Sequence, residues 1–199
     1  MTSKMSGKLL VLVGLFFSTT ALAVPTQNED VASLINQRLS YMKDVAGYKA
    51  NNHLAIEDLS QEAKVLSSTA LEAEKLGLDG ESVKFFIQAQ MDVAKAIQYR
   101  YRADWLSISE KGWQPKSLEQ VRKKISALNT NILADVSTKL AMDYRFTDKT
   151  AFMKKLDQTH LKDSDKERLW NSLRQITLKK LKRQHDVSVH GTPAAKLDG

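Results

Sequence analysis

Proline is nearly absent from the interior of this chain, and that scarcity limits the folds open to it. Of 199 residues only three are proline, Pro25, Pro115 and Pro193, and the eight glycines stand mostly where a helix would end. Because proline breaks a helix and glycine weakens one, this distribution permits long uninterrupted helices. No strand-like alternation, hairpin turn, glycine-rich phosphate loop or repeat is visible. The sequence therefore predicts an all-α fold.

Apolar residues recur at intervals of three and four through six segments, which predicts a bundle of about six helices. The predicted helices run from about Glu29 to Asn51, Asp58 to Leu76, Asp79 past Trp105, Ser117 past Leu140, Asp148 to His160 and Ser164 to Gln184. The last of them is predicted to end in a basic cluster of Lys179, Lys180, Lys182 and Arg183. Cations there suit the negative end of the helix dipole, so the cluster is interpreted as a solvated helix end.

The first 23 residues have the pattern of a cleavable export signal. Lys4 and Lys8 precede an apolar run over 9–17, and Ala21 and Ala23 give the small-x-small pattern of a cleavage site. The run is too short to span a bilayer as a stable helix, and polar sequence follows it at once. We expect a cut near Ala23, a periplasmic or secreted mature protein, and no membrane attachment after cleavage.

Charge and cysteine content narrow the partners of the mature chain. Residues 1–23 carry two of the 30 lysines and arginines and none of the 23 acidic residues, which leaves 28 against 23, a formal charge of +5. This excess favours small anionic ligands, and export argues against nucleic acid. With no cysteine, disulfides and thiol chemistry are excluded. We expect one helical domain over 24–185, followed by a disordered tail over 186–199.

Two cations lie within the apolar stripe of the first predicted helix. Eleven residues at about 100° each bring Lys49 to within roughly 20° of Arg38 on the helical wheel, so both point where the core should be. Buried cations are scarce unless an anion meets them, which makes the pair a candidate anion site. The alternative is that each side chain extends to water along its aliphatic stem.

Polar residues also occur on the predicted inward faces of the other long helices. They are Asp58, Gln61 and Glu62 on the second helix, Gln90 and Gln98 on either side of Ala94 on the third, and Arg122 near the start of the fourth. Helix bundles commonly build sites from such residues, and this set suits a dicarboxylate whose charge redistributes. No histidine lies near the carboxylates at ligand spacing and no nucleophile has a paired base, so neither a metal site nor a covalent catalyst is predicted.

Each of these polar residues also has a structural alternative. Asp58 could simply cap its helix, Gln90 and Gln98 could satisfy buried backbone groups, and Arg122 could pair with Glu119 or lie flat on the surface.

The same residues resemble a known family, the all-helical AroQ-class chorismate mutases, and in particular their exported gamma subclass. The resemblance covers the mature chain to about residue 140. It rests on Leu34-Ile-Asn-Gln-Arg38-Leu, Lys49, Ile56-Glu-Asp58, the stretch from Phe85 to Trp105, and Arg122 ahead of Ile125-Ser-Ala-Leu-Asn129.

The resemblance implies a type II chorismate mutase-like fold, no cofactor, and the Claisen rearrangement of chorismate to prephenate. Catalysis then means selecting the compact diaxial conformer and stabilising negative charge on the ether oxygen. The implied carboxylate ligands are Arg38 and Arg122, and Lys49 is implied to bridge a carboxylate and the ether oxygen. Gln98 is implied to donate to the same oxygen, and Asp58 and Glu62 to hold the ring hydroxyl. A homodimer with a complete site in each subunit is also implied.

Two positions depart from the family pattern. Gln61 stands where the family usually has an arginine, and Ala94 where it has a hydroxyl residue, with Lys64 or Lys95 as candidates to compensate. Two other functions therefore stay open at this point. One is an inactive periplasmic protein that binds an aromatic or shikimate-type acid. The other is a helical periplasmic chaperone or adaptor, whose polar residues would line an exposed concave surface.

Overall fold

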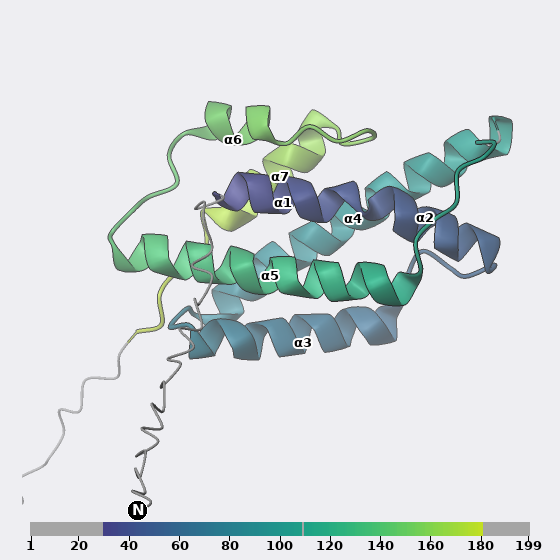
Figure 1. Cartoon of the computed structure of the whole chain (residues 1–199). Helices are drawn as coiled ribbons and strands as arrows, with labels where there is room; N and C mark the ends of the chain where they lie inside the picture. The colour runs from purple at the N-terminus through teal and green to yellow at the C-terminus, as the bar shows by residue number, and fades with distance from the viewer. Residues whose placement is uncertain (1–29, 109, 181–199) are drawn as a thin grey trace, which may run out of the picture.

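The computed structural model describes residues 30–108 and 110–180, and over these residues the chain folds into seven α-helices (Figure 1). They are α1 (Val31–Ser40), α2 (Met42–Asn51), α3 (Leu59–Lys75), α4 (Gly80–Ser107), α5 (Leu118–Ala141), α6 (Lys149–Lys155) and α7 (Asp163–Leu173). The all-α prediction is confirmed. The predicted export signal and the predicted tail lie outside the described residues.

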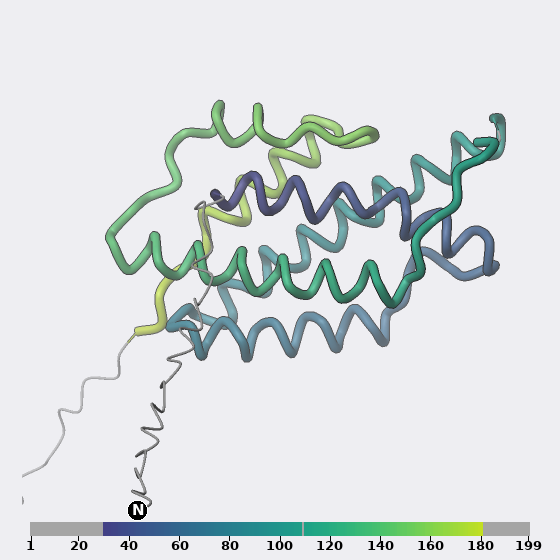
Figure 2. The backbone as a smooth tube through the Cα atoms, in the orientation of Figure 1, coloured from purple at the N-terminus to yellow at the C-terminus, as the bar shows by residue number. Residues whose placement is uncertain are grey.

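The described residues form seven helices rather than the predicted six or so, because the first predicted helix is divided at Tyr41. Tyr41 ends α1 and precedes α2 with backbone angles still in the right-handed helical region, φ −79° and ψ −6°. Figure 2 shows that α1 and α2 follow one another in nearly the same direction. The interruption therefore changes the path of the chain little.

Side-chain caps fix the starts of the long helices. Asp30 accepts hydrogen bonds from the first turn of α1, Asp58 from Gln61 N, Asp79 from Ser82 N, and Ser117 from Gln120 N. Each cap satisfies a backbone N–H group that has no partner inside its helix. After α3 the chain turns at Gly77, whose φ of +80° is a conformation that glycine adopts without strain.

The last two helices are shorter than the sequence predicted: α6 ends at Lys155 rather than His160, and α7 at Leu173 rather than Gln184. Tertiary hydrogen bonds take the backbone beyond α7 out of the helix. Thr177 O accepts from Asp79 N at 2.8 Å, and Lys179 N donates to Gly77 O at 2.9 Å. The predicted placement of the basic cluster in the last turns of the helix is therefore wrong for Lys179 and Lys180, and its other two members lie outside the described residues.

Helix α4 is the centre of the bundle. It packs against α2, α3 and α7, while α1 packs against α5 and α6 (Figure 1). Many of the largest fully buried side chains come from these helices, among them Ile35, Phe86, Ile97, Ile132 and Leu133. This apolar core holds α1 to α5 around one cavity. Among the described residues, none of the helices has the length and apolar character to cross a membrane.

The connection between α4 and α5 packs against α2 through Trp113. A Cβ atom added at Gly47 would lie 2.6 Å from two ring carbons of Trp113 and 3.3 Å from Pro115 Cβ. Lys43 Nζ lies 4.5 Å from the centre of one ring of the same indole. Glycine in a helix interior costs about 0.5–1 kcal/mol relative to alanine, so the close approach of the indole explains why it stands there.

We expect Gly47→Ala to lower the free energy of unfolding by about 1–3 kcal/mol, because the new methyl group overlaps the indole. In a Trp113→Leu background the same change should raise that free energy by up to about 1 kcal/mol, because the overlap is gone and alanine favours the helix. Denaturant unfolding of the four proteins measures both effects. An equal effect of Gly47→Ala in both backgrounds would show that the indole does not require the glycine.

Candidate functional site

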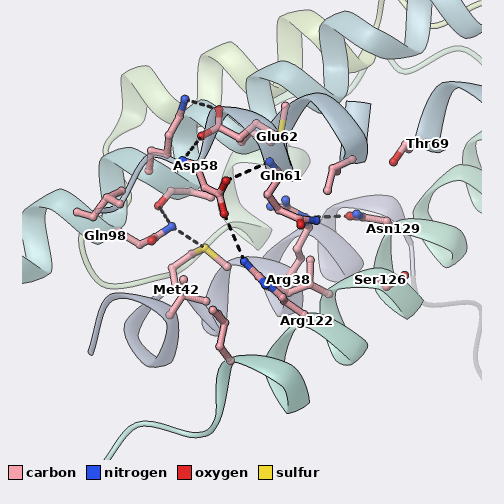
Figure 3. Close-up of a pocket in the computed structure, with 18 of the residues that line it drawn as sticks. Arg38, Met42, Asp58, Gln61, Glu62, Thr69, Gln98, Arg122, Ser126 and Asn129 are labelled. Carbon is pink, nitrogen blue, oxygen red and sulfur yellow. Dashed lines mark hydrogen bonds and ion pairs between the residues drawn. The ribbon is translucent and has the colours of Figure 1, made fainter. Parts of the chain in front are cut away.

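A cavity of about 410 Å³ lies among α1, α2, α3, α4 and α5. Of the residues that the sequence marked for the site, Gln90 does not line this cavity and eight others do, six of which are labelled in Figure 3. The eight are Arg38, Lys49, Asp58, Gln61, Glu62, Ala94, Gln98 and Arg122. The helical wheel and the family resemblance therefore located the cavity, although the eight residues differ in burial and in the partners they have.

Arg38 is a buried cation without a carboxylate partner among the described residues. Its side chain belongs to α1, and the residue is only 5% exposed. Nε donates to Asn129 Oδ1 at 2.9 Å, and Nη1 donates to the backbone carbonyl of Gln90 at 3.4 Å. Burial lowers the pKa of the guanidinium to about 10. The alternative of extension to water is wrong for Arg38.

Lys49 is the second buried cation, on α2, and is 8% exposed. Its ammonium group donates to the backbone carbonyl of Ile56. Burial lowers the pKa of Lys49, and the negative charge of Asp58 opposes that shift in part. Arg38 and Lys49 thus give one wall of the cavity two desolvated positive charges.

Gln98, on α4, places an amide in the lining of the cavity. Nε2 donates to the carbonyl of Ala94 at 3.1 Å, one turn earlier in the same helix, and lies 3.7 Å from Met42 Sδ. Oε1 is buried with no hydrogen-bond partner among the described residues. A buried amide that is only partly satisfied within the protein is suited to bind a ligand.

Gln90 lies on the same stripe of α4 and does not line the cavity. It is fully buried, and neither side-chain atom has a partner among the described residues. Its contribution to the site is the backbone carbonyl that accepts from Arg38.

Two acidic residues at the start of α3 lie at the rim of the cavity: Asp58, which caps the helix, and Glu62 in its first turn. Asp58 caps the helix through Gln61 N at 3.1 Å, and its carboxylate lies 3.8 Å from Arg122 Nη2 (Figure 3). The capping alternative is thus correct, and it does not remove Asp58 from the cavity. Arg122 is half-exposed and pairs with Asp58, whereas Glu119 pairs with Lys123, so the alternative of an Arg122–Glu119 pair is wrong.

Glu62 is fixed through both of its oxygens. Oε1 accepts from Asp58 N at 3.2 Å, and Oε2 accepts from Lys95 Nζ at 2.8 Å. Lys95 also lies 3.5 Å from Asp92, and the hydrogen bond to Glu62 raises the pKa of Lys95. Of the two lysines considered as compensation for Gln61, Lys95 lines the cavity, whereas Lys64 is exposed and does not.

Sequence reasoning missed Asn129 as a site residue. It lies on α5, is 9% exposed, lines the cavity and holds Arg38. The available signal was a polar residue next to Leu128 within the apolar stripe of its helix. Its partner is 91 positions away in the sequence, and no local pattern identifies such a pairing.

Comparisons with known proteins agree on one family. The family model for chorismate mutase type II matches residues 26–99. A secreted chorismate mutase of Yersinia pestis is 49% identical over 176 residues, covering 87% of this chain and 93% of that protein. A monofunctional chorismate mutase of Enterobacter agglomerans is 41% identical over 156 residues, covering 78% of this chain and 83% of that protein.

The solved structures that resemble this chain include two chorismate mutases. The crystal structure of the secreted chorismate mutase from Yersinia pestis superimposes with a TM-score of 0.73 at 50% identity, covering 77% of this chain and 100% of that one. A chorismate mutase structure from Burkholderia thailandensis, at 21% identity, has a TM-score of 0.58 and covers 72% of this chain and 94% of that one, which supports the fold alone.

Proposed function

This chain belongs to the chorismate mutase family, and from that premise we propose that its five-helix cavity is where chorismate rearranges to prephenate. The observation that carries the proposal is the buried guanidinium of Arg38, which has no carboxylate partner among the described residues, in a cavity that Arg122 also lines. Chorismate is a dicarboxylate, and a bound carboxylate would supply the counter-ion that Arg38 lacks.

Three cations would hold the two carboxylates. Arg38 takes one from the buried wall, and Arg122 takes the other from the rim. The pair between Arg122 and Asp58 is long and half-exposed, so exchanging it for a substrate carboxylate costs little. Lys49 lies within the same lining and bridges a carboxylate to the ether oxygen.

The reaction needs positioning and electrostatics rather than a covalent catalyst. The ether C–O bond breaks while a C–C bond forms within one molecule, and negative charge grows on the ether oxygen. Lys49 and Gln98 donate to that oxygen, and each donor fixed in a dry site is worth about 3–4 kcal/mol of transition-state stabilisation. A cavity that holds both carboxylates also favours the compact conformer in which the two reacting carbons meet.

The rim carboxylates would hold the ring hydroxyl. Asp58 is fixed by its capping bond, and Glu62 by Lys95 and the Asp58 backbone, so both can accept a hydrogen bond without reorganising. Lys95 is already paired with two carboxylates, which makes it a support for Glu62 rather than a replacement for a missing arginine. Gln61 and Ala94 line the cavity as neutral neighbours of the substrate.

We also propose export with a cut near Ala23, which the secreted relative supports. The mass of the exported protein tests the cut, because a chain that starts at Val24 is expected. We also propose that the protein forms a homodimer with a complete site in each subunit, as the family resemblance implies.

Purified mature protein should consume chorismate, which is measured as loss of its ultraviolet absorbance. We expect Arg38→Ala and Gln98→Ala each to lower turnover at least about tenfold, because each removes a donor to the developing charge or to a carboxylate. Lys64→Ala is the matched control, since Lys64 is exposed and outside the cavity. Thermal stabilisation by a transition-state analogue without any turnover would point to an inactive binding protein instead.

The rate should be nearly flat between about pH 6 and 8, because an amide at position 98 donates at every pH. An alkaline fall in kcat/KM is expected to begin below the ordinary lysine pKa of 10.5, because burial lowers the pKa of Lys49 and loss of its proton removes a donor. Gln98→Glu should instead lose activity as pH rises through the carboxyl pKa, because only the protonated acid donates. A steep fall of the wild-type rate just above neutrality, or the same profile for Gln98→Glu, would exclude this role for Gln98.

A further inference from the structure

We infer that Asn129 is a positioning residue that holds Arg38 through a neutral oxygen, so that the arginine is fixed in direction while its charge stays available to an anion. This inference rests on the proposed function and adds a residue on α5 to the site. Asn129 Oδ1 accepts from Arg38 Nε at 2.9 Å across the interface between α1 and α5 (Figure 3).

Both groups that fix Arg38 are uncharged. The amide oxygen of Asn129 comes from α5, and the carbonyl of Gln90 comes from α4. Together they use two of the five N–H donors of the guanidinium, and the other three make no hydrogen bond to a described residue. A carboxylate can be bound by two parallel N–H groups of one guanidinium, and these remaining donors permit that geometry.

Two of the other three lining cations are held in a different way, whereas Lys49, like Arg38, is buried and donates to a backbone carbonyl. Lys95 is paired with Glu62 and Asp92, and Arg122 with Asp58. Lys95 and Arg122 already have a counter-ion, whereas Arg38, the most buried of the four cations, has none among the described residues. A carboxylate at position 129 would pair with Arg38 inside the protein. The amide that stands there leaves the positive charge of Arg38 available to a substrate anion.

The side chain at position 129 that would best stabilise the ligand-free protein differs from the one that would best permit anion binding. A carboxylate in place of the amide would compensate a desolvated charge and stabilise the ligand-free protein. The same carboxylate would repel a bound anion and would already occupy the guanidinium. The lowered pKa of Arg38, caused by burial, agrees with a site in which the cation is not compensated.

The direct test compares Asn129→Asp with Asn131→Asp, which makes the same chemical change two residues away at an exposed position on the same helix. Steady-state kinetics with chorismate should show at least about a tenfold rise in KM for Asn129→Asp and less than a twofold rise for Asn131→Asp. Thermal denaturation without ligand should show a melting temperature for Asn129→Asp that equals or exceeds that of the wild type.

A second variant separates positioning from charge. Asn129→Ala removes the acceptor without adding a charge, so Arg38 loses its direction, and we expect kcat to fall by about tenfold or more. Asn129→Asp keeps an acceptor at the same place. Its kcat should therefore decrease by a smaller factor, relative to the wild type, than the factor by which its KM increases. A residue that served the fold alone would produce no such split between kcat and KM.

Three results would overturn the inference. The first is a KM of Asn129→Asp within twofold of that of Asn131→Asp. The second is a loss of cooperative unfolding in Asn129→Asp, because a carboxylate beside an uncompensated cation should not destabilise the fold. The third is a kcat of Asn129→Ala equal to that of the wild type. A wild-type protein that does not convert chorismate would instead refute the proposed function.

Discussion

The whole arrangement depends on a buried positive charge that has no carboxylate partner among the described residues. Arg38 is desolvated, and its partners are an amide oxygen and a backbone carbonyl. Such a charge is costly in an apolar interior, so it persists only where surrounding packing is strong enough to hold it. The apolar core around α4 supplies that packing. Three helices converge on this one guanidinium: α1 carries it, and α4 and α5 hold it.

The C-terminal helices extend this support to α4, which also carries Gln98. Arg100 donates to the carbonyl of His160 at 2.6 Å and pairs with Asp165 of α7. His160 Nε2 lies 3.0 Å from Asp104, near the end of α4. These contacts fasten α7 and the segment before it along the second half of α4. The contacts of His160 and Asp165 with α4 therefore help to hold the helix that carries Gln98 in place.

Much of this could be predicted from the sequence, because the signals are local. Asp58, Asp79 and Ser117 mark helix starts through capping, and the 3.6-residue period placed Arg38 and Lys49 on one buried face. Interactions between distant segments could not be predicted in this way. The backbone bonds from Thr177 and Lys179 to the α3–α4 turn end the last helix early, and the Arg38–Asn129 bond joins residues 91 positions apart.

Our expectation is that an anionic ligand supplies the counter-ion that Arg38 lacks among the described residues. Thermal denaturation with and without a dicarboxylate transition-state analogue tests it most directly, in the wild type and in Arg38→Met, which keeps an apolar chain in place of the guanidinium. We expect the analogue, at about 100 times its dissociation constant, to stabilise the wild type by about 2.7 kcal/mol, and the same concentration to stabilise Arg38→Met much less. Equal stabilisation of both proteins would show that Arg38 is not where the anion binds.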